Sequence, residues 1–505
     1  MALGEGCPTA YARLEELMHR RLGRDCLYMP SCRLGLYVAL RHWCSPGGRV
    51  LMSPVNDDVI FFVVLAAGLR PVQAPLKAED GTIDLAAVPA SALAGLSAVI
   101  TTNLYGNPDP APALREHCDA LGIPLIEDAA HAIGSEVEGR PVGGFGDASV
   151  FSLSKHAGAG TGGFLTVADP SLRPALERAR DALLEPGRLS AELRYGLRPY
   201  AEAGVRGLRL TPAARATMRL LGLQERDGIR MELRPGELKQ AMAGTGPHAS
   251  GTHALDDFRS WVRVDMHDYR LRPGALRLAR TERLLARLDG RLAAYRAGTR
   301  KLLATEWAPP QPGPVQPLFR VPLLVADRDA AVAALARRRI TVGYLYDPPL
   351  DTYAGETFTD LSPSPGQAAW FARHALPVNP LTADQVIATL RASAIHPAAP
   401  PPDPRPAAAR PPGASSAPRN PGRRRTDVPP HTGGPYPGAG PASTPPALGT
   451  RPATAEPGAG TAVRRPGPNG DGTAEPPAPG GAAGSVDTGP LPGPGRPLPQ
   501  AGSSV

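Results

Sequence analysis

Lysine is the rarest charged residue in this chain of 505 residues, which carries four of them, at positions 77, 155, 239 and 301. Apart from the histidines, the other basic residues are arginines, which replace lysine on most protein surfaces. Arginine cannot replace lysine where an amine must lose its proton near neutral pH and attack a carbonyl carbon. The few lysines are therefore candidates for covalent chemistry, and Lys155 stands out because a glycine-rich loop follows it.

Cysteine is scarce as well, and its five copies are scattered along the chain: Cys7, Cys26, Cys32, Cys44 and Cys118. An odd number without CxxC or Cys/His spacing argues against a disulfide framework and against a zinc site. We therefore expect free thiols in a reducing cytoplasm, and no metal site.

Long apolar runs are missing too. The longest, Val59–Leu69, is shorter than the roughly 20 residues that a membrane-spanning helix needs. The N-terminal stretch carries early acidic residues and lacks the apolar core of a signal peptide. The net charge of +8 is modest for this length, so nucleic acid binding is not indicated. The expectation is a cytoplasmic protein without stable membrane insertion.

Large apolar residues almost vanish after residue 395. Residues 396–505 consist mostly of Pro, Gly, Ala, Ser, Thr and Arg. Such a segment buries too little surface to offset its ordering entropy, which predicts a disordered tail. The tail is either a dispensable solvated extension or an interaction segment that uses basic clusters such as Arg423–Arg425.

What the sequence does contain, from about residue 30 to 170, is an alternation of strand-length and helix-length segments. Runs that are apolar throughout indicate strands buried on both faces, and strand–helix alternation indicates an α/β sheet with helices on both sides. The predicted strands are Arg49–Ser53, Arg70–Ala74, Ala98–Thr102, Pro124–Glu127, Ala148–Ser152 and Gly163–Val167, and the predicted helices include Leu34–Trp43, Val59–Ala67 and Ala111–Leu121.

Ligands of such folds bind beyond the carboxyl ends of the strands, where Asp128 and Lys155 are expected. Pyridoxal phosphate needs an amine for its aldehyde, a carboxylate for its ring nitrogen and donors for its phosphate. Lys155, Asp128 and Ser152 supply these groups, and the glycines after Lys155 allow the backbone to turn close to the cofactor.

The stretch "IEDAAHAIGSEVEGRPVGGFGDASVFSLSK" resembles the core of the DegT/StrS sugar aminotransferases, which have the fold type I of pyridoxal-phosphate enzymes. The segments "CRLGLYVALRHW", "LAAGLRPVQAP", "TTNLYGNP", "DYRLRPGALRLARTERLL" and "HALPVNPLTADQVIATL" extend the resemblance over roughly residues 30–395. It implies an α/β large domain with a mixed, mostly parallel sheet, followed by a smaller C-terminal α/β domain.

The resemblance also implies roles for single residues. Lys155 binds the cofactor as a Schiff base and moves the proton, and Asp128 pairs with the pyridine nitrogen. His131 stands near the ring hydroxyl, and Ser152 holds the phosphate. The plainer alternatives are that His131 is a polar residue on a turn and that Ser152 is an ordinary buried serine.

The phosphate side departs from the family pattern. The family's S-G-T is Ser31, Cys32 and Arg33 here, at a helix start that suits an anion, and the Arg33 charge could bind the phosphate directly. The family's Asn from the neighbouring subunit is Asp268, whose carboxylate repels a phosphate unless it is paired, with Arg33 or Arg270 as the expected partner.

The substrate side departs as well. The aromatic residue that often stacks on the cofactor ring falls near Asp57, and the family's substrate-side His is Asp351. Ser152 lies closer to the lysine than the family's serine does. These changes indicate a divergent branch.

We therefore expect a large cofactor-binding domain over residues 1–270, a small domain over 271–395 and the tail over 396–505. Residues 170–262 form a predicted helical insertion that packs on the core or on a partner subunit, or else a basic amphipathic surface for a membrane or an acidic partner. The expected activity is transfer of an amino group from glutamate or glutamine to a keto sugar or keto cyclitol by a homodimer. The alternative is a catalytically degenerate relative that binds the cofactor to regulate or scaffold.

Overall fold

A computed structural model of the chain describes residues 8–197, 230–246, 251–263, 268–311 and 313–401. Its centre is a seven-stranded sheet with the strand order β1-β9-β8-β5-β4-β2-β3. These strands are β1 (Asp25–Met29), β2 (Arg49–Met52), β3 (Arg70–Gln73), β4 (Leu96–Thr101), β5 (Leu125–Asp128), β8 (Ala148–Ser152) and β9 (Gly163–Val167). Strand β9 runs antiparallel to β1 and β8, and the other neighbouring strands are parallel.

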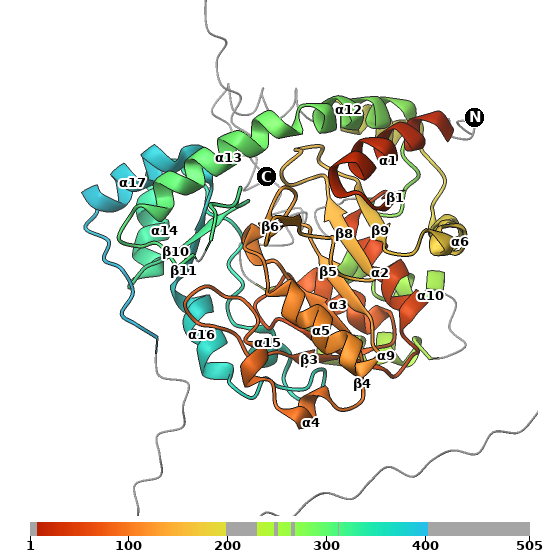
Figure 1. The fold of residues 1–505 in the computed structure, drawn as a ribbon, viewed down its shortest axis with the longest axis horizontal. Coiled ribbons are helices and arrows are strands. Elements are labelled where there is room, and N and C mark those ends of the chain that lie inside the picture. Colours follow the sequence, from red (N-terminus) through yellow and green to blue (C-terminus); the bar gives the residue numbers. More distant parts are fainter. Residues whose placement is uncertain (1–7, 198–229, 247–250, 264–267, 312, 402–505) are drawn as a thin grey trace, which may run out of the picture. The chain divides into compact units, whose positions relative to one another are not determined.

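Helices cover both faces of this sheet (Figure 1). Successive side chains of a strand point to opposite faces, and so Ile100 packs in one apolar cluster with α2 and α3, whereas Val99 packs in another with α5. The helices that contribute to the two faces include α1 (Pro8–Leu22), α2 (Cys32–Trp43), α3 (Asp58–Ala66), α5 (Ala111–Leu121), α6 (Arg173–Leu183), α9 (Pro235–Ala243), α10 (Gly251–Asp257), α11 (Arg259–Val262), α12 (Ala275–Ala286) and α16 (Pro365–His374).

The six strands expected from the sequence are all present, within two residues at each end. Strand β1 was not expected. Its sequence "DCLYM" is short and begins with a charged residue, and only its pairing with β9 identifies it as a strand, through a register from Asp25 opposite Val167 to Met29 opposite Gly163. Non-local pairing of this kind leaves little trace in the local sequence.

A second, smaller apolar core lies in the C-terminal part of the described chain. Strands β10 (Val321–Leu324) and β11 (Ala375–Val378) pair in antiparallel fashion. Helices α13 (Leu288–Leu303), α14 (Arg328–Arg337) and α17 (Ala383–Ala392) pack with these strands around the buried Trp307. The remaining short elements are α4 (Ala90–Leu93), α15 (Leu350–Ala354), β6 (Glu136–Val137), β7 (Arg140–Pro141), and the 3-10 turns Leu85–Ala87, Leu104–Gly106, Pro170–Leu172 and Pro380–Thr382.

The expected start of the tail at residue 396 is too early. The carbonyl oxygen of His396 accepts a hydrogen bond from Ala326 N at 2.9 Å, and Ala398 N donates to Leu324 O at 3.0 Å. These bonds continue the edge of the small sheet by a bridge between Val325 and Pro397. Residues 402–505, which make up nearly all of the predicted tail, lie outside the described residues.

Within residues 170–262 the described parts are largely helical. Helix α6 packs on α2 and β1, and α9 and α11 pack on α3. The stretch 198–229 lies outside the described residues. No helix in the described ranges is both long and apolar enough to cross a bilayer.

Candidate functional site

The predicted site residues come together because three parallel strands end at the same edge of the sheet. Strands β1, β5 and β8 run in one direction. Asp128 closes β5, Ser31 follows β1, and Lys155 follows β8. The antiparallel β9 begins at this same edge, where Gly162 forms a bridge with Ser31.

Asp128 is a buried carboxylate, with 4% of the residue exposed. Its Oδ1 accepts a hydrogen bond from Ala130 N at 3.0 Å, and its backbone carbonyl accepts one from Asn103 Nδ2 at 3.0 Å. Burial raises the pKa of Asp128 to about 7, against smaller opposing effects of the Ala130 amide and the charge of Lys155. A cation placed against this carboxylate would stabilise its ionised form, because the negative charge would then not be buried without a partner.

Lys155 lies three residues beyond β8 and is half-buried. Its Nζ is 5.5 Å from the centroid of the Phe319 ring. Its charge also contributes to the pKa of Asp128, His131 and Cys32, so its ammonium group is within electrostatic reach of all three. The amine and the buried carboxylate therefore share one site.

His131 belongs to a row of stacked rings. Its imidazole lies 6.2 Å from Tyr105 and 5.2 Å from Phe319, each at an interplanar angle of 15°. Tyr105 stacks in turn on Tyr346 at 5.5 Å. Burial, with a smaller effect of Lys155, lowers the pKa of His131 well below its usual value. The imidazole is therefore neutral at pH 7 and can either donate or accept a hydrogen bond.

The turn that carries Tyr105 is conformationally unusual. Asn103 and Tyr105 have φ values of 44° and 57°, a left-handed region that non-glycine residues seldom adopt. The turn is held by its neighbours, because Tyr105 O accepts from Phe319 N at 2.8 Å and the Tyr105 hydroxyl donates to Tyr344 O at 2.9 Å. The ring row was not expected from the sequence, since its members come from segments that are far apart along the chain.

The amino terminus of α2 points to the same edge. Ser31 is its N-cap, and its Oγ accepts from Leu34 N at 3.2 Å while it donates to Tyr269 O at 3.0 Å. The Ser31 hydroxyl thus shapes the helix end, and the first backbone N–H groups of the helix, at Cys32 and Arg33, are the natural anion donors. Burial raises the pKa of the Cys32 thiol well above its usual value, so the thiol is neutral.

The side chain of Arg33 extends from the start of α2 to Val262 and Tyr269. Its Nη1 donates to Val262 O, and its guanidinium lies 5.7 Å from the centroid of the Tyr269 ring. Asp268 forms an ion pair with Arg263 at 2.8 Å, a partner that the sequence reasoning did not consider. The expected alternative, Arg270, instead pairs with Asp256 at 2.8 Å.

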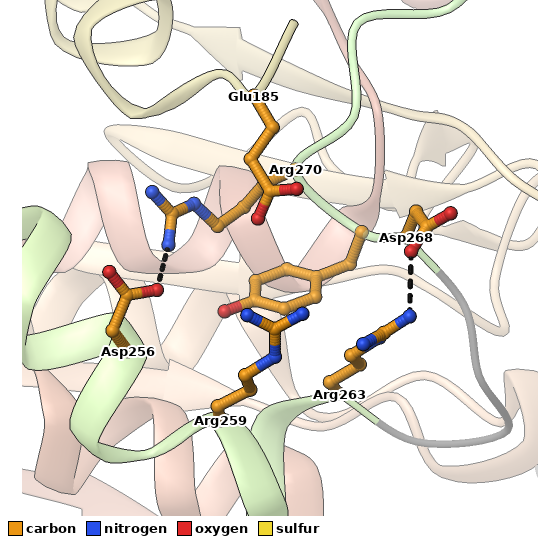
Figure 2. Close-up of a pocket in the computed structure, with 7 residues that line it drawn as sticks. Glu185, Asp256, Arg259, Arg263, Asp268 and Arg270 are labelled. Carbon is orange, nitrogen blue, oxygen red and sulfur yellow. Dashed lines mark hydrogen bonds and ion pairs between the residues drawn. The ribbon is translucent and has the colours of Figure 1, made fainter. Parts of the chain in front are cut away.

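These two ion pairs lie in the pocket of Figure 2. Its lining residues are Glu185, Asp256, Arg259, Arg263, Asp268, Tyr269 and Arg270. The pocket is mixed in charge and borders the start of α2 through the Ser31–Tyr269 hydrogen bond. Of the predicted site residues it contains Asp268 alone, so it is a neighbour of the Lys155–Asp128 site.

The three remaining predicted positions have simple local contacts. Ser152 is buried, and its Oγ is 2.8 Å from Ser154 Oγ. Asp57 caps α3 by accepting from Val59 N at 3.0 Å. Its charge contributes to the raised pKa of Asp128 and partly opposes the lowering of the pKa of His131. The position where the resembled family often has an aromatic residue thus presents a carboxylate to the site. Asp351 is buried in α15, which raises its pKa.

Arg230 is a residue that sequence reasoning missed. Its buried guanidinium pairs with Asp58 at 2.5 Å and donates to the carbonyl oxygens of Tyr346 and Pro348 at 3.2 and 2.7 Å. It therefore joins the start of α3 to the segment that carries one end of the ring row. Nothing in the sequence distinguishes this arginine from the many others.

Comparison with known proteins bears on the site as a whole. The model of the DegT/DnrJ/EryC1/StrS aminotransferase family matches residues 11–192. The chain is 33% identical over 150 residues to a UDP-N-acetyl-3-dehydro-alpha-D-glucosamine 3-aminotransferase of Acidithiobacillus ferrooxidans, which covers 29% of this chain and 41% of that protein. It is 34% identical over 136 residues to an L-glutamine:2-deoxy-scyllo-inosose aminotransferase of Streptomyces kanamyceticus, which covers 26% and 32%.

The chain thus spans less than half the length of these curated relatives. A solved structure, a DegT DnrJ EryC1 StrS aminotransferase from Brucella abortus, superposes with a TM-score of 0.53 at 17% identity, over 77% of this chain and 91% of that one. The predicted fold class, the fold type I of pyridoxal-phosphate enzymes, is thereby confirmed. The predicted resemblance is confirmed as well, because the model of the DegT/DnrJ/EryC1/StrS aminotransferase family matches residues 11–192 of this chain.

Proposed function

We propose that the chain is a pyridoxal-phosphate-dependent aminotransferase that moves an amino group from glutamate or glutamine to a keto sugar or keto cyclitol. One observation carries the proposal: the buried Asp128, whose pKa is raised, closes β5, and Lys155 follows the end of the adjacent strand β8. The acceptor class and the glutamine donor are supported by the names of the matched relatives.

The residues at the site fit this cofactor. A buried carboxylate with a raised pKa suits the protonated ring nitrogen, since the pair offsets the cost of burying either charge alone. The half-buried Lys155 suits the aldehyde, and the amino terminus of the 12-residue helix α2 suits the phosphate. Phe319 and His131 place ring surfaces beside Lys155.

Pyridoxal phosphate, when bound, supplies a ring that accepts the electrons released at the donor's α-carbon. Lys155 would hold the aldehyde through its amine and would carry the α-proton. Asp128 would keep a proton on the ring nitrogen, and the neutral His131 would hydrogen-bond the ring hydroxyl. Ser152 and the backbone amides of Cys32 and Arg33 would hold the phosphate, and the charge of Arg33 and the paired Asp268 would change the electrostatic potential there.

The wider assignments belong to the same proposal. The enzyme is a cytoplasmic homodimer, with a large domain over residues 1–270 and a small domain that begins at 271 and includes the bridge at Pro397. The separate apolar core around Trp307 supports the division into two domains. The degenerate alternative gains no support, because Lys155 and Asp128 lie together and a mere binder needs neither.

The first half of the reaction tests the proposal without knowledge of the acceptor. The full chain, loaded with pyridoxal phosphate and mixed with glutamate or glutamine, should release one equivalent of keto acid. Asp128→Asn should slow this release by about 100-fold or more, because a preorganised charge is lost at the reacting ring. A cofactor-loaded wild-type protein that releases no keto acid from any amino acid in a broad panel would contradict the activity.

A further inference from the structure

The loop that carries Lys155 depends on contacts from outside itself. It connects β8 to β9 over residues 153–162, and within it Gly158 and Gly160 have φ values of +68° and +72°. Three backbone hydrogen bonds shape it locally, from Gly158 N to Lys155 O at 3.1 Å, from Ala159 N to Leu153 O at 2.9 Å and from Leu153 N to Gly162 O at 3.0 Å. A glycine-rich loop of this kind has high conformational freedom, so anchors decide where its lysine points.

Four side-chain hydrogen bonds anchor the loop to the rest of the described chain. Three of them join it to segments that the fold already brings close: Arg291 Nε donates to His156 O at 2.7 Å, His156 Nε2 to Pro317 O at 2.8 Å, and Thr161 Oγ1 to Pro30 O at 3.0 Å. The fourth comes from the predicted insertion, where the Tyr195 hydroxyl donates to Ala159 O at 2.7 Å.

Tyr195 is itself held in place. Tyr195 lies on a helix over residues 189–197. The guanidinium carbons of Arg277 and Arg280 are 4.9 and 5.4 Å from the centroid of its ring. One turn earlier, Glu192 forms a buried ion pair with Arg277 at 3.1 Å. Burial raises the pKa of Tyr195, which keeps its hydroxyl protonated and able to donate.

The opposite face of this helix is different. Leu189, Leu193 and Leu197 are 58%, 52% and 62% exposed, whereas Glu192 is buried. The helix therefore attaches to the molecule through the face that carries Glu192 and Tyr195. Through the Tyr195 hydroxyl, that face contacts the carbonyl oxygen of Ala159. Ala159 comes directly after the turn that is closed by the hydrogen bond from Gly158 N to Lys155 O.

We propose that Tyr195 is a positioning residue for Lys155, and that one role of the helix over residues 189–197 is to brace the lysine loop. This inference rests on the proposed function of Lys155. Loss of the Tyr195 hydroxyl frees the Ala159 carbonyl, loosens the turn from Lys155 to Gly158 and spreads the positions of the lysine amine. The ring contacts with the two arginines remain, so the helix itself stays attached.

Tyr195→Phe tests this inference, and Tyr353→Phe is a matched control, because the Tyr353 hydroxyl also donates to a backbone carbonyl, Met231 O, at 2.7 Å. Hydrogen exchange of the chain without cofactor should speed up about fivefold at the Gly158 and Ala159 amides in Tyr195→Phe, the loss expected from one hydrogen bond. The control should leave these amides unchanged.

The second measurement is the pH profile of Lys155 modification by pyridoxal phosphate and borohydride. Tyr195→Phe should shift the profile and slow modification severalfold, with little change in melting temperature. Equal exchange and an equal profile in Tyr195→Phe and wild type would overturn the inference, as would the same change in the control. Failure of the wild-type chain to be labelled at Lys155 would contradict the proposed function. The hydrogen-exchange result would still test whether Tyr195 holds the lysine loop in place.

Discussion

The two sides of the candidate site differ in how far they follow the family pattern. On one side, Lys155 and Asp128 occupy the ends of neighbouring strands, as the pattern requires. On the other, the start of α2 carries Cys32 and Arg33, and Asp268 faces it from a distant segment with its own partner, Arg263. The chemistry of a reaction fixes residue types strictly, whereas a phosphate can be held by any suitable set of donors.

The largest effect is expected on the side that follows the pattern. Lys155→Arg keeps a positive charge but removes an amine that can be deprotonated near neutral pH. We expect keto-acid release from glutamate or glutamine to fall below detection, measured on the full chain incubated with pyridoxal phosphate. Lys301→Arg is the control, since Lys301 pairs with Asp384 on the surface. Wild-type rates of keto-acid release in Lys155→Arg would contradict the role that is proposed for Lys155.

A second prediction concerns the buried carboxylate without cofactor. Because the pKa of Asp128 is raised to about 7, the folded chain keeps a proton that the unfolded chain loses near pH 4. The free energy of unfolding should therefore fall as the pH rises from about 4 to 7, by up to about 4 kcal/mol for this group. Asp128→Asn should lack that part of the slope.

Urea unfolding of both proteins across this pH range measures the difference. The variant should be the more stable of the two at pH 8, and the gap should close toward pH 4. Parallel stability curves for wild type and variant would contradict this prediction, because they would show that folding does not raise the pKa of Asp128.

A third prediction addresses the side that departs from the pattern. Arg33→Ala and Arg263→Ala should each weaken pyridoxal phosphate binding about tenfold, the first by losing a charge-assisted contact and the second by leaving Asp268 unpaired. Pyridoxal, which lacks the phosphate, is the control ligand and should bind as in wild type. Equal losses for both ligands would mean that these arginines support the fold and not the phosphate.

The smallest effect is expected far from the site. Deletion of residues 402–505 should leave the melting temperature unchanged, because the sequence of this segment contains few large apolar residues. Deletion from His396 should cost about 1–2 kcal/mol, since it removes two backbone hydrogen bonds to the small sheet. Thermal unfolding of the two truncations side by side separates these outcomes, and equal losses would show that residues 402–505 also contribute to stability.

A feature of the fold or of the site could be predicted from the sequence where it is determined by a short stretch of the chain. The buried strands, Asp128 and Lys155 could be located because apolar runs and strand ends are written in short stretches of sequence. Strand β1, the Asp268–Arg263 pair, the Arg230 contacts and the ring row of Tyr105, His131, Phe319 and Tyr346 could not. Each joins segments far apart in the chain, and an arginine or tyrosine in such a pair looks like any other.

The central claim is that Lys155, opposite Asp128, is the residue that binds the cofactor. It is tested most directly by borohydride reduction of the pyridoxal-phosphate-loaded chain, followed by peptide mapping of its four lysines. We expect one pyridoxyl group per chain on Lys155, and none on Lys77, Lys239 or Lys301. A label on any of those three, or no specific label at all, would contradict it.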